Sequence, residues 1–254
     1  MLCTFDIGNT SISIGLFDGD TIRNTWRMGT DPHKSPDEYA VFLLNLLQYA
    51  NVQRTDVTEI MLSSVVPALV SPFIDISKRY FGKEPLLLAP GIRTGVRVMT
   101  DNPREVGADR IANAAAAHHY YGGPLMVIDF GTGTNFDVVS KDGDFIGGAI
   151  APGIEIARDA LFARAAKLPS VELVFPPSAI GKNTITAMQS GLLYGYVGLI
   201  EGISKRITAE LGGSAKVIAT GGLSTLIAPH APFIETVDPF LTLKGLKIIH
   251  SLNR

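Results

Sequence analysis

The sequence predicts an α/β protein of two duplicated domains with a cleft between them. A short pattern, an apolar run followed by an Asp and a turn rich in Gly and Thr, occurs at Asp6 and again at Asp129. The two copies lie 123 residues apart in a chain of 254. Both are followed by the same predicted order of elements, β-β-β-α-β-α-β-α. Because a repeated order over half a chain indicates duplication, we expect domains at residues 1–121 and 122–254.

The first half begins with three predicted strands, at residues 2–7, 11–17 and 21–28, the last two joined by the hairpin signal Asp18-Gly19. Ser35 and Glu38 form a capping box around Pro36, which predicts a helix start there. Four more elements complete the half: a strand at 59–66, a helix at 67–81, a strand at 85–89 and a helix at 102–121. Alanines in the last helix would allow another backbone to approach closely.

Gly122-Gly123-Pro124 ends that helix and marks the expected domain boundary. The second half repeats the order, with strands predicted at 125–129, 135–140 and 144–150. We expect a long irregular insertion after them, then a helix at 183–211. The remaining elements are a strand at 215–219, a helix, a strand at 233–237 and a terminal helix.

The composition excludes several classes of protein. Hydrophobic residues make up 46% of the chain and charged residues 18%, which is enough to bury a core. A net charge of −2 and the absence of a Lys/Arg run give no bulk attraction to nucleic acid or to an anionic membrane. The single cysteine, and the lack of a signal peptide or of a run of about 18 apolar residues, indicate a cytoplasmic protein without membrane spans.

The two Asp turns point to a polyphosphate site. An Asp at the end of an apolar strand is costly to bury unless it is paired or binds a metal. Glycine lets backbone N–H groups approach phosphate oxygens, and Thr and Ser hydroxyls add donors. One copy alone would be explained better as an ordinary Asx-turn, but two copies favour phosphate binding. The pattern is neither a P-loop nor a dinucleotide-binding fingerprint.

Two further segments are candidates for function. Within the helix predicted at 102–121, Asp109 could accept a hydroxyl proton and Arg110 could bind a carboxylate, although the spacing alone would favour a solvated surface ion pair. Gly221 and Gly222 follow a predicted strand and could let a base or ribose lie against the backbone; the alternative is a tight strand-to-helix connection. The sequence contains no set of Cys and His residues that would predict a transition-metal site. It also contains no motif of a Ser or Cys nucleophile.

An ordered set of motifs extends over nearly the whole chain. Its most chemically informative members are Asp6-Ile7-Gly8-Asn9-Thr10, Gly107-Ala108-Asp109-Arg110, Asp129-Phe130-Gly131-Thr132, Gly181-Lys182-Asn183-Thr184 and Thr220-Gly221-Gly222-Leu223. The set also includes Asn102-Pro103-Arg104-Glu105-Val106, Ala166-Lys167-Leu168-Pro169, Met188-Gln189-Ser190-Gly191 and the ending Asp238 to Leu246. Taken in order, these motifs resemble the type III pantothenate kinase family.

The resemblance implies an actin-like (ribonuclease H-like) fold and ATP-dependent phosphorylation of pantothenate to 4′-phosphopantothenate, the first step of coenzyme A synthesis. It also implies a homodimer, ATP with Mg²⁺, and a monovalent cation, K⁺ or NH₄⁺. Asp109 would be the proton acceptor, Asp129 would hold the monovalent cation and Asp6 would lie near Mg²⁺. By the resemblance, ATP phosphates would bind Asp6, Ile7, Gly8, Asn9, Thr10, Ser11, Ile12, Ser13 and Thr132, and substrate would bind Gly107, Ala108, Asp109, Arg110 and Thr184. We expect the base of ATP near Gly221 and Gly222.

Some positions depart from the commonest pattern of the family. Thr100 stands where a Tyr that contacts substrate is common, and Gly133 and Asn135 replace Ala and Thr of the second phosphate turn. Phe240 replaces a common Asp. The turn still carries small or polar groups, so we expect phosphate binding there.

A different class of function also fits a two-domain nucleotide cleft. A nucleotide-binding regulator or an actin-like ATPase could keep the cleft without phosphoryl transfer to a small molecule. Asp109 and Arg110 favour the kinase, because a pure ATP switch does not need them. A sugar kinase of the same superfamily is a third reading, for which 254 residues is short.

Overall fold

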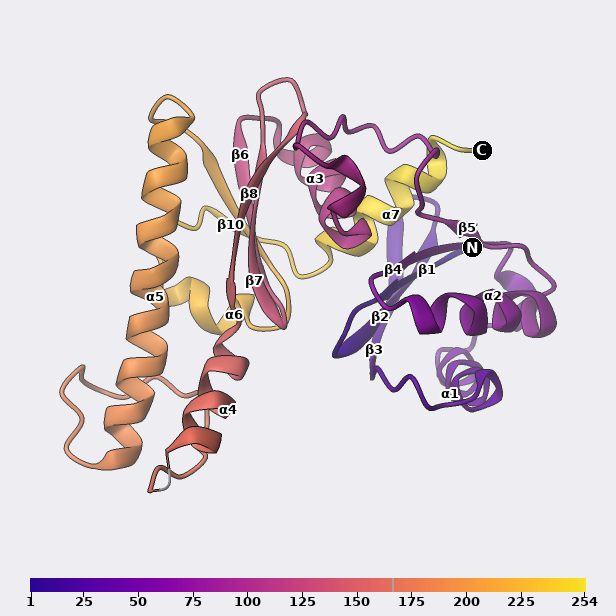
Figure 1. Cartoon of the computed structure of the whole chain (residues 1–254). Helices are drawn as coiled ribbons and strands as arrows, with labels where there is room; N and C mark the ends of the chain where they lie inside the picture. The colour runs from indigo at the N-terminus through magenta and orange to yellow at the C-terminus, as the bar shows by residue number, and fades with distance from the viewer. Residues whose placement is uncertain (166) are drawn as a thin grey trace. The chain divides into compact units, whose positions relative to one another are not determined.

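The structure is a computed structural model and describes residues 1–165 and 167–254 (Figure 1). Ala166, part of one motif above, lies outside the described residues. The chain forms two compact units. Unit 1 comprises Met1–Arg97, Asp101–Ala116 and Leu241–Arg254, and unit 2 comprises Val98–Thr100 and Ala117–Phe240. These units differ from the expected ranges 1–121 and 122–254, because the C-terminal segment packs with unit 1 and the division falls inside a helix.

Unit 1 is built on a five-stranded sheet in the order β3-β2-β1-β4-β5. The central strand β1 pairs antiparallel with β2 and parallel with β4. Its strands are β1 (Leu2–Ile7), β2 (Ser11–Asp18), β3 (Thr21–Gly29), β4 (Glu59–Ser64) and β5 (Leu86–Leu87). Its helices are α1 (Pro36–Tyr49), α2 (Pro67–Phe81), α7 (Leu241–Ser251) and the beginning of α3 (Ala108–Tyr121), with short 3-10 turns at Arg54–Asp56 and Pro103–Glu105.

The predicted start of α1 is confirmed by its capping contacts. The Glu38 N–H donates to the Ser35 hydroxyl at 3.3 Å, and the Glu38 carboxylate accepts from the Ser35 N–H at 2.8 Å. Both groups would otherwise lack partners at a helix end, so the pair fixes where the helix begins.

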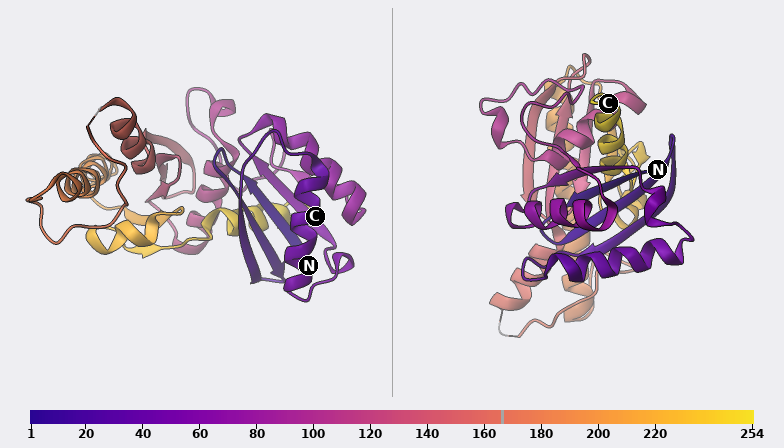
Figure 2. Two further views of the ribbon diagram at one scale, coloured as in Figure 1. Left: turned by 90° about the horizontal axis from the view of Figure 1, so that it is seen from below. Right: turned by 90° about the vertical axis from the view of Figure 1, so that its right-hand side faces the viewer.

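Period-two alternation along the strands gives the sheet of unit 1 two apolar faces. On one face, Phe5 and Ile14 pack with α1 and α2 through Leu43 and Phe73. On the other face, a second cluster joins the sheet to α3 and α7: Leu2, Phe17, Met61, Ala112, Ala115, Leu243, Leu246 and Ile249. Figure 2 shows the helices of unit 1 about this sheet.

The alanines of α3 allow the close approach that the sequence predicts. A Cβ placed on Gly245 of α7 would overlap the backbone carbonyl of Ala112, so the two helices meet backbone to backbone. Beside this crossing, the Thr242 hydroxyl donates to the buried Asn113 side chain at 2.7 Å. The crossing therefore requires glycine at position 245.

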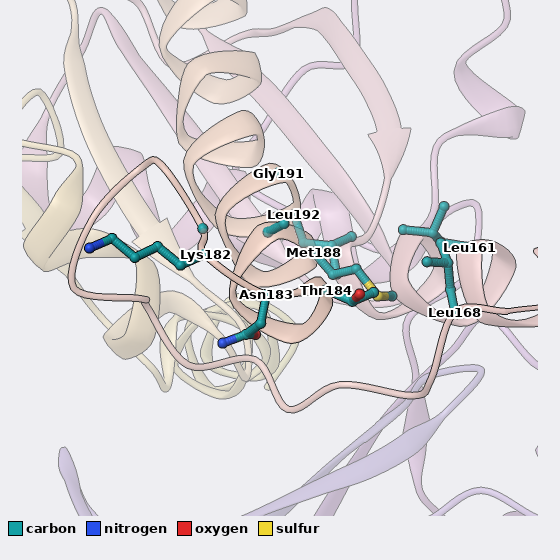
Figure 3. Close-up of a pocket in the computed structure, with 10 residues that line it drawn as sticks. Leu161, Leu168, Lys182, Asn183, Thr184, Met188, Gly191 and Leu192 are labelled. Atoms are coloured by element: carbon teal, nitrogen blue, oxygen red, sulfur yellow. The ribbon is translucent and has the colours of Figure 1, made fainter.

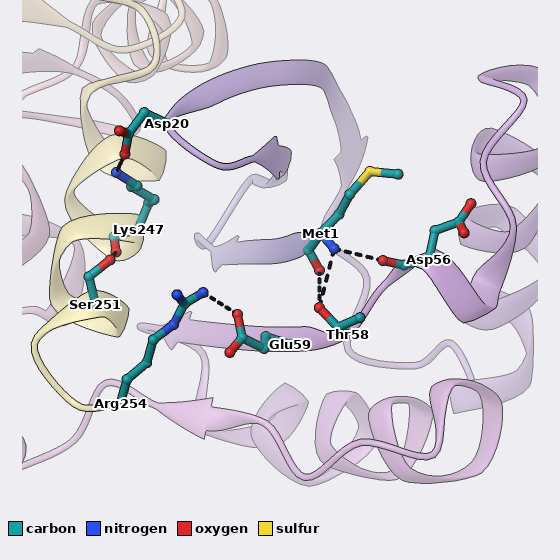
Figure 4. A network of polar contacts seen from close by, with 8 residues as sticks. All are labelled: Met1, Asp20, Asp56, Thr58, Glu59, Lys247, Ser251 and Arg254. Carbon is teal, nitrogen blue, oxygen red and sulfur yellow. Dashed lines mark hydrogen bonds and ion pairs between the residues drawn. The ribbon is translucent and has the colours of Figure 1, made fainter.

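Polar contacts tie the two ends of the chain to unit 1 (Figure 4). The N-terminal ammonium donates to the Asp56 carbonyl at 2.7 Å. Lys247 of α7 pairs with Asp20, and Arg254 pairs with Glu59. Because exposed ion pairs contribute at most about 1 kcal/mol each, the apolar cluster and the helix crossing dominate the attachment of α7.

Unit 2 repeats the sheet of unit 1, in the order β10-β9-β6-β7-β8. Its strands are β6 (Leu125–Phe130), β7 (Gly133–Val139), β8 (Phe145–Pro152), β9 (Lys216–Thr220) and β10 (Thr236–Val237). Its helices are α4 (Ile154–Arg164), α5 (Thr184–Glu210) and α6 (Ser224–Ile227), followed by a 3-10 turn at Ala228–His230. The expectation of a wholly irregular insertion after β8 is wrong, because α4 lies within it. The strand expected at 233–237 is only two residues long.

The duplication extends to the burial of individual residues. Strands β1 and β6 share one pattern, four buried positions, a half-buried Asp and a buried residue. Strands β2 and β7 also agree over seven positions. The predicted fold class, a duplicated actin-like α/β protein, is confirmed. No helix among the described residues is long and apolar enough to cross a bilayer.

Candidate active site

The turn after β1 is fixed by backbone contacts and exposes two polar side chains. The Gly8 N–H donates to the Ser11 carbonyl at 3.0 Å. Thr30, just after β3, donates its hydroxyl to the Gly8 carbonyl at 2.6 Å and its N–H to the Thr10 carbonyl at 3.0 Å. Asn9 and Thr10 are exposed and Asp6 is half-buried. The turn thus presents polar groups from a preformed backbone.

Two of the residues expected to bind ATP phosphates point away from this surface. Ile7 and Ile12 are both fully buried in the cluster under α1 and α2. Their side chains hold the turn in the core and are not available to a ligand. Ser11 and Ser13 are half-buried on the opposite face of β2.

Asp109 lies in the first turn of α3. Its expected place in a helix interior is wrong: α3 begins at Ala108, and Gly107 precedes it as the cap whose carbonyl accepts the Ile111 N–H at 3.2 Å. A Cβ on Gly107 would overlap the Asp109 carboxylate, which explains the glycine. The Asp109 Oδ1 accepts the Arg110 N–H at 2.8 Å.

The Asp109 carboxyl is poorly solvated. Burial raises its pKa above the ordinary value, while the Arg110 N–H and the Arg110 charge oppose that rise. Asp109 is therefore a stronger proton acceptor than an exposed aspartate would be, and it is still held by one backbone donor.

Asp6 and Asp109 are brought to the same end of the sheet. The Val65 N–H, just after β4, donates to the Ile7 carbonyl at 3.0 Å. A Cβ on Gly107 would lie 3.5 Å from Val65 Cγ1. The start of α3 thus sits beside the carboxyl ends of β1 and β4, where the Asp6 turn also begins.

The second turn belongs to unit 2. The Gly131 N–H donates to the Gly133 carbonyl at 3.1 Å, and the Gly153 N–H donates to the Thr132 carbonyl at 3.1 Å. Thr132 is exposed, whereas Asp129 is half-buried. This turn therefore also combines a fixed backbone with an exposed hydroxyl.

Gly221 packs directly against Asp129. Its φ is +88°, and a Cβ there would lie 2.5 Å from Asp129 Oδ1 and 2.6 Å from the Phe130 nitrogen. Only glycine fits this place, because it tolerates the positive φ and leaves room for the carboxylate. Gly222 is exposed beside it.

The structure places two of the positions that depart from the family pattern, Asn135 and Thr100, and the neighbour of the first, Thr134. Asn135 lies directly opposite Asp129 across β6 and β7. Thr134 is fully buried and its hydroxyl bonds to that of Tyr196. The Thr100 hydroxyl is buried without a hydrogen-bond partner among the described residues.

Thr184 lines an open groove of about 700 Å³ in unit 2 (Figure 3). It begins α5, which Asn183 caps by accepting the Thr186 N–H at 2.9 Å. The groove is polar at Lys182, Asn183 and Thr184, and its apolar lining includes Leu161, Leu168, Met188 and Leu192. These apolar lining residues were missed from the sequence, since part of the groove comes from the unexpected helix α4.

The carboxylates of Asp6 and Asp129 suit a cation that keeps most of its phosphate and water ligands. No group of three or more His, Cys, Asp or Glu side chains among the described residues could hold a metal by itself. One half-buried aspartate at each turn fits Mg²⁺ carried by a nucleotide, because Mg²⁺ usually binds through one or two carboxylates, phosphates and water.

Known proteins resemble this chain along its whole length. A model of the family described as type III pantothenate kinase matches residues 2–206. A type III pantothenate kinase from Moorella thermoacetica is 50% identical over 253 residues and is covered completely, as is this chain. One from Roseiflexus sp. strain RS-1 is 51% identical over 254 residues, again with complete coverage of both chains.

A solved structure extends the likeness to the fold. An inorganic polyphosphate/ATP-glucomannokinase from Arthrobacter sp. strain KM superimposes with a TM-score of 0.54 at 15% identity, over 100% of this chain and 99% of the other. At that identity the likeness concerns the fold alone. The full-length identity near 50% shows more: the chain belongs to the type III pantothenate kinase family.

Proposed function

We propose that this chain transfers the terminal phosphoryl group of ATP to the primary hydroxyl of pantothenate, with Asp109 as the proton acceptor. The product is 4′-phosphopantothenate, in the first step of coenzyme A synthesis. Membership of the family supports the reaction. The observation that carries the role of Asp109 is its position: a poorly solvated carboxylate beside the end of the strand that bears Asp6.

Asp109 acts on the acceptor hydroxyl. The Asp109 oxygen that is not bonded to the Arg110 N–H accepts the proton of the pantothenate hydroxyl as the hydroxyl oxygen attacks phosphorus. The Arg110 N–H keeps the carboxylate in place. Gly107 and Ala108 shape the backbone beside it. Arg110 is the candidate to bind the carboxylate of pantothenate, because guanidinium groups pair with carboxylates in a bidentate manner.

The Asp6 turn receives the phosphates. Asn9, Thr10, Ser11 and Ser13 offer side-chain donors. Asp6 would hold Mg²⁺ through water. When bound with ATP, Mg²⁺ neutralises charge on the transferred group.

Unit 2 supplies the other contacts. Thr132 donates to phosphate, and the base lies against Gly221 and Gly222. Asp129 holds K⁺ or NH₄⁺, and Gly221 packs against its carboxylate, where a Cβ would overlap it. Thr184 binds substrate at the polar end of its groove.

We also propose a homodimer in the cytoplasm that binds neither nucleic acid nor membrane. Helix α5 carries three exposed glycines, Gly191, Gly195 and Gly198, on one face, and a Cβ at any of them would meet nothing within 4 Å. Each costs about 1 kcal/mol relative to Ala in a helix interior. A second copy packed closely on this face would explain them. The net charge of −2 supports the absence of nucleic acid and anionic lipid.

A coupled assay of ADP release tests the reaction. We expect ADP to form only when pantothenate is added, and faster with K⁺ than with Na⁺. ADP release that does not depend on pantothenate would instead support the nucleotide-binding regulator or actin-like ATPase. A wild-type rate in Na⁺ alone would remove the monovalent cation from the proposal.

A further inference from the structure

A row of polar side chains crosses four adjacent strands of unit 1. Arg27 of β3 lies opposite Ser13 of β2, Ser13 opposite Asp6 of β1, and Asp6 beside Ser63 of β4. Residues paired in this way project from the same face of a sheet. The side chains of Asp6, Ser13 and Arg27 therefore share one surface.

This row lies on the face of the sheet that carries Asp109. Met61 lies two residues before Ser63, and Leu2 lies four residues before Asp6, so each shares a face of the sheet with the row. Both belong to the cluster with α3 and α7. Val65, two residues after Ser63, is the residue that the start of α3 approaches. The row thus crosses the sheet just where Asp109 and the Asp6 turn meet.

Arg27 lies at the outer end of the row, and its exposed guanidinium is held by one hydrogen bond. Its Nε donates to the Ser11 hydroxyl at 2.8 Å, and Ser11 belongs to the turn expected to bind phosphates. Among the described residues no acidic side chain pairs with it. The bond through Nε orients the plane of the group and leaves its two terminal amino groups for another acceptor, in the fork that suits phosphate.

The duplicated turn of unit 2 has no such cation. The equivalent row there contains Asn135, Asp129 and Thr220, and its outer position is Ile150. Ile150 is 69% exposed. The fold of this turn therefore does not require a cation at the outer position, and Arg27 is specific to unit 1.

We propose that Arg27 binds the polyphosphate of ATP, on the side of the turn away from Asp109. Neighbouring strands are about 4.8 Å apart, so the Arg27 and Asp6 backbones are separated by roughly 10 Å. A polyphosphate lying along the row would meet Asp6, with its Mg²⁺, at one end and the guanidinium at the other. This inference rests on the proposed use of ATP and adds a residue to its binding site.

The test compares ATP with adenosine, which has the same base and ribose but no phosphate. We expect Arg27→Ala to raise the KM for ATP and weaken ATP binding in calorimetry by about 10- to 100-fold, as for loss of one charge-assisted contact. Binding of adenosine and the KM for pantothenate should change less than about twofold. Arg27→Lys should fall between, since it keeps the charge without the fork.

Arg23 provides a matched control on the same strand. It is exposed and contacts Met1, four residues before Arg27 and away from the turn. Arg23→Ala should bind ATP as the wild type does. Wild-type ATP affinity in Arg27→Ala, or equal weakening of ATP and adenosine, would overturn the proposal. Absence of pantothenate-dependent turnover in the wild type would overturn the proposed reaction instead, and the ATP and adenosine titrations would still decide the role of Arg27.

Discussion

Asp109 owes its chemistry to the end of a helix. Gly107 lets the chain turn into α3 without a Cβ in the way of the carboxylate, and the Arg110 N–H holds one of its oxygens. Burial raises its pKa, so the folded protein keeps a carboxylate in a place that disfavours charge. Such a group is more basic and also less stable in its ionised form.

Asp109→Asn should separate these two effects. We expect kcat to fall by about 10²- to 10⁴-fold, because the amide cannot accept the hydroxyl proton. In the wild type, activity should fall as pH drops through the raised pKa of Asp109, where the carboxylate becomes protonated. The residual activity of the variant should lack this limb in a pH–rate profile.

The stability of the same variant should move the other way. A carboxylate with a raised folded pKa destabilises the protein above that pKa, and the penalty disappears as pH falls below it. Asn carries no charge, so the variant should melt at a higher temperature than the wild type at neutral pH. Near wild-type turnover in Asp109→Asn would remove Asp109 as the proton acceptor.

At the scale of elements, α7 is the clearest case of a segment placed by packing. It belongs to unit 1 although it follows the last strand of unit 2. His250 near its end is 7% exposed, and its Nδ1 has no hydrogen-bond partner among the described residues. Burial lowers the pKa of His250; Glu59 opposes this change and Arg254 adds to it.

The free energy of unfolding should therefore fall in mild acid because of the buried His250 in α7. The unfolded chain binds a proton at His250 near pH 6.5, whereas the folded chain binds it only at lower pH. Stability is fully present above that range and is lost as pH falls through it, by at most about 1.4 kcal/mol per pH unit. Chemical denaturation of the wild type and of His250→Leu between pH 8 and pH 5.5 measures this contribution.

His250→Leu should show a flatter dependence on pH than the wild type. His33→Leu provides the control, since His33 is exposed. If the two variants and the wild type lose stability in parallel, the buried histidine does not contribute.

At the scale of the whole molecule, duplication gave two turns that have since diverged. The strands keep the same burial and order, but the positions around the two Asp residues differ. Arg27 of unit 1 corresponds to Ile150 of unit 2, and Ser13 corresponds to Asn135. A shared fold with different side chains explains how the two turns could take different cations and different parts of one nucleotide.

Gly195→Leu tests the proposed dimer. Space around Gly195 is open within the chain, so the larger side chain should not disturb the fold. It would separate two helices that meet there. We expect a dimer for the wild type and a monomer for the variant in light scattering after gel filtration, with an unchanged circular dichroism spectrum. A variant that stays dimeric would place the interface elsewhere, and a monomeric wild type would contradict the homodimer.

The sequence by itself determined the strands, the caps and the two Asp turns, because these depend on local periodicity and on the cost of burying a carboxylate. It predicted α1 from its capping residues, predicted a long helix at the place of α5, and missed α4. Only the tertiary structure decided that α7 packs with unit 1, that Gly107 precedes α3 and that Gly221 lies against Asp129. It also decided that Arg27 joins Asp6 in one row. These features depend on strand register and on backbones meeting across long separations in the chain, which no local pattern records.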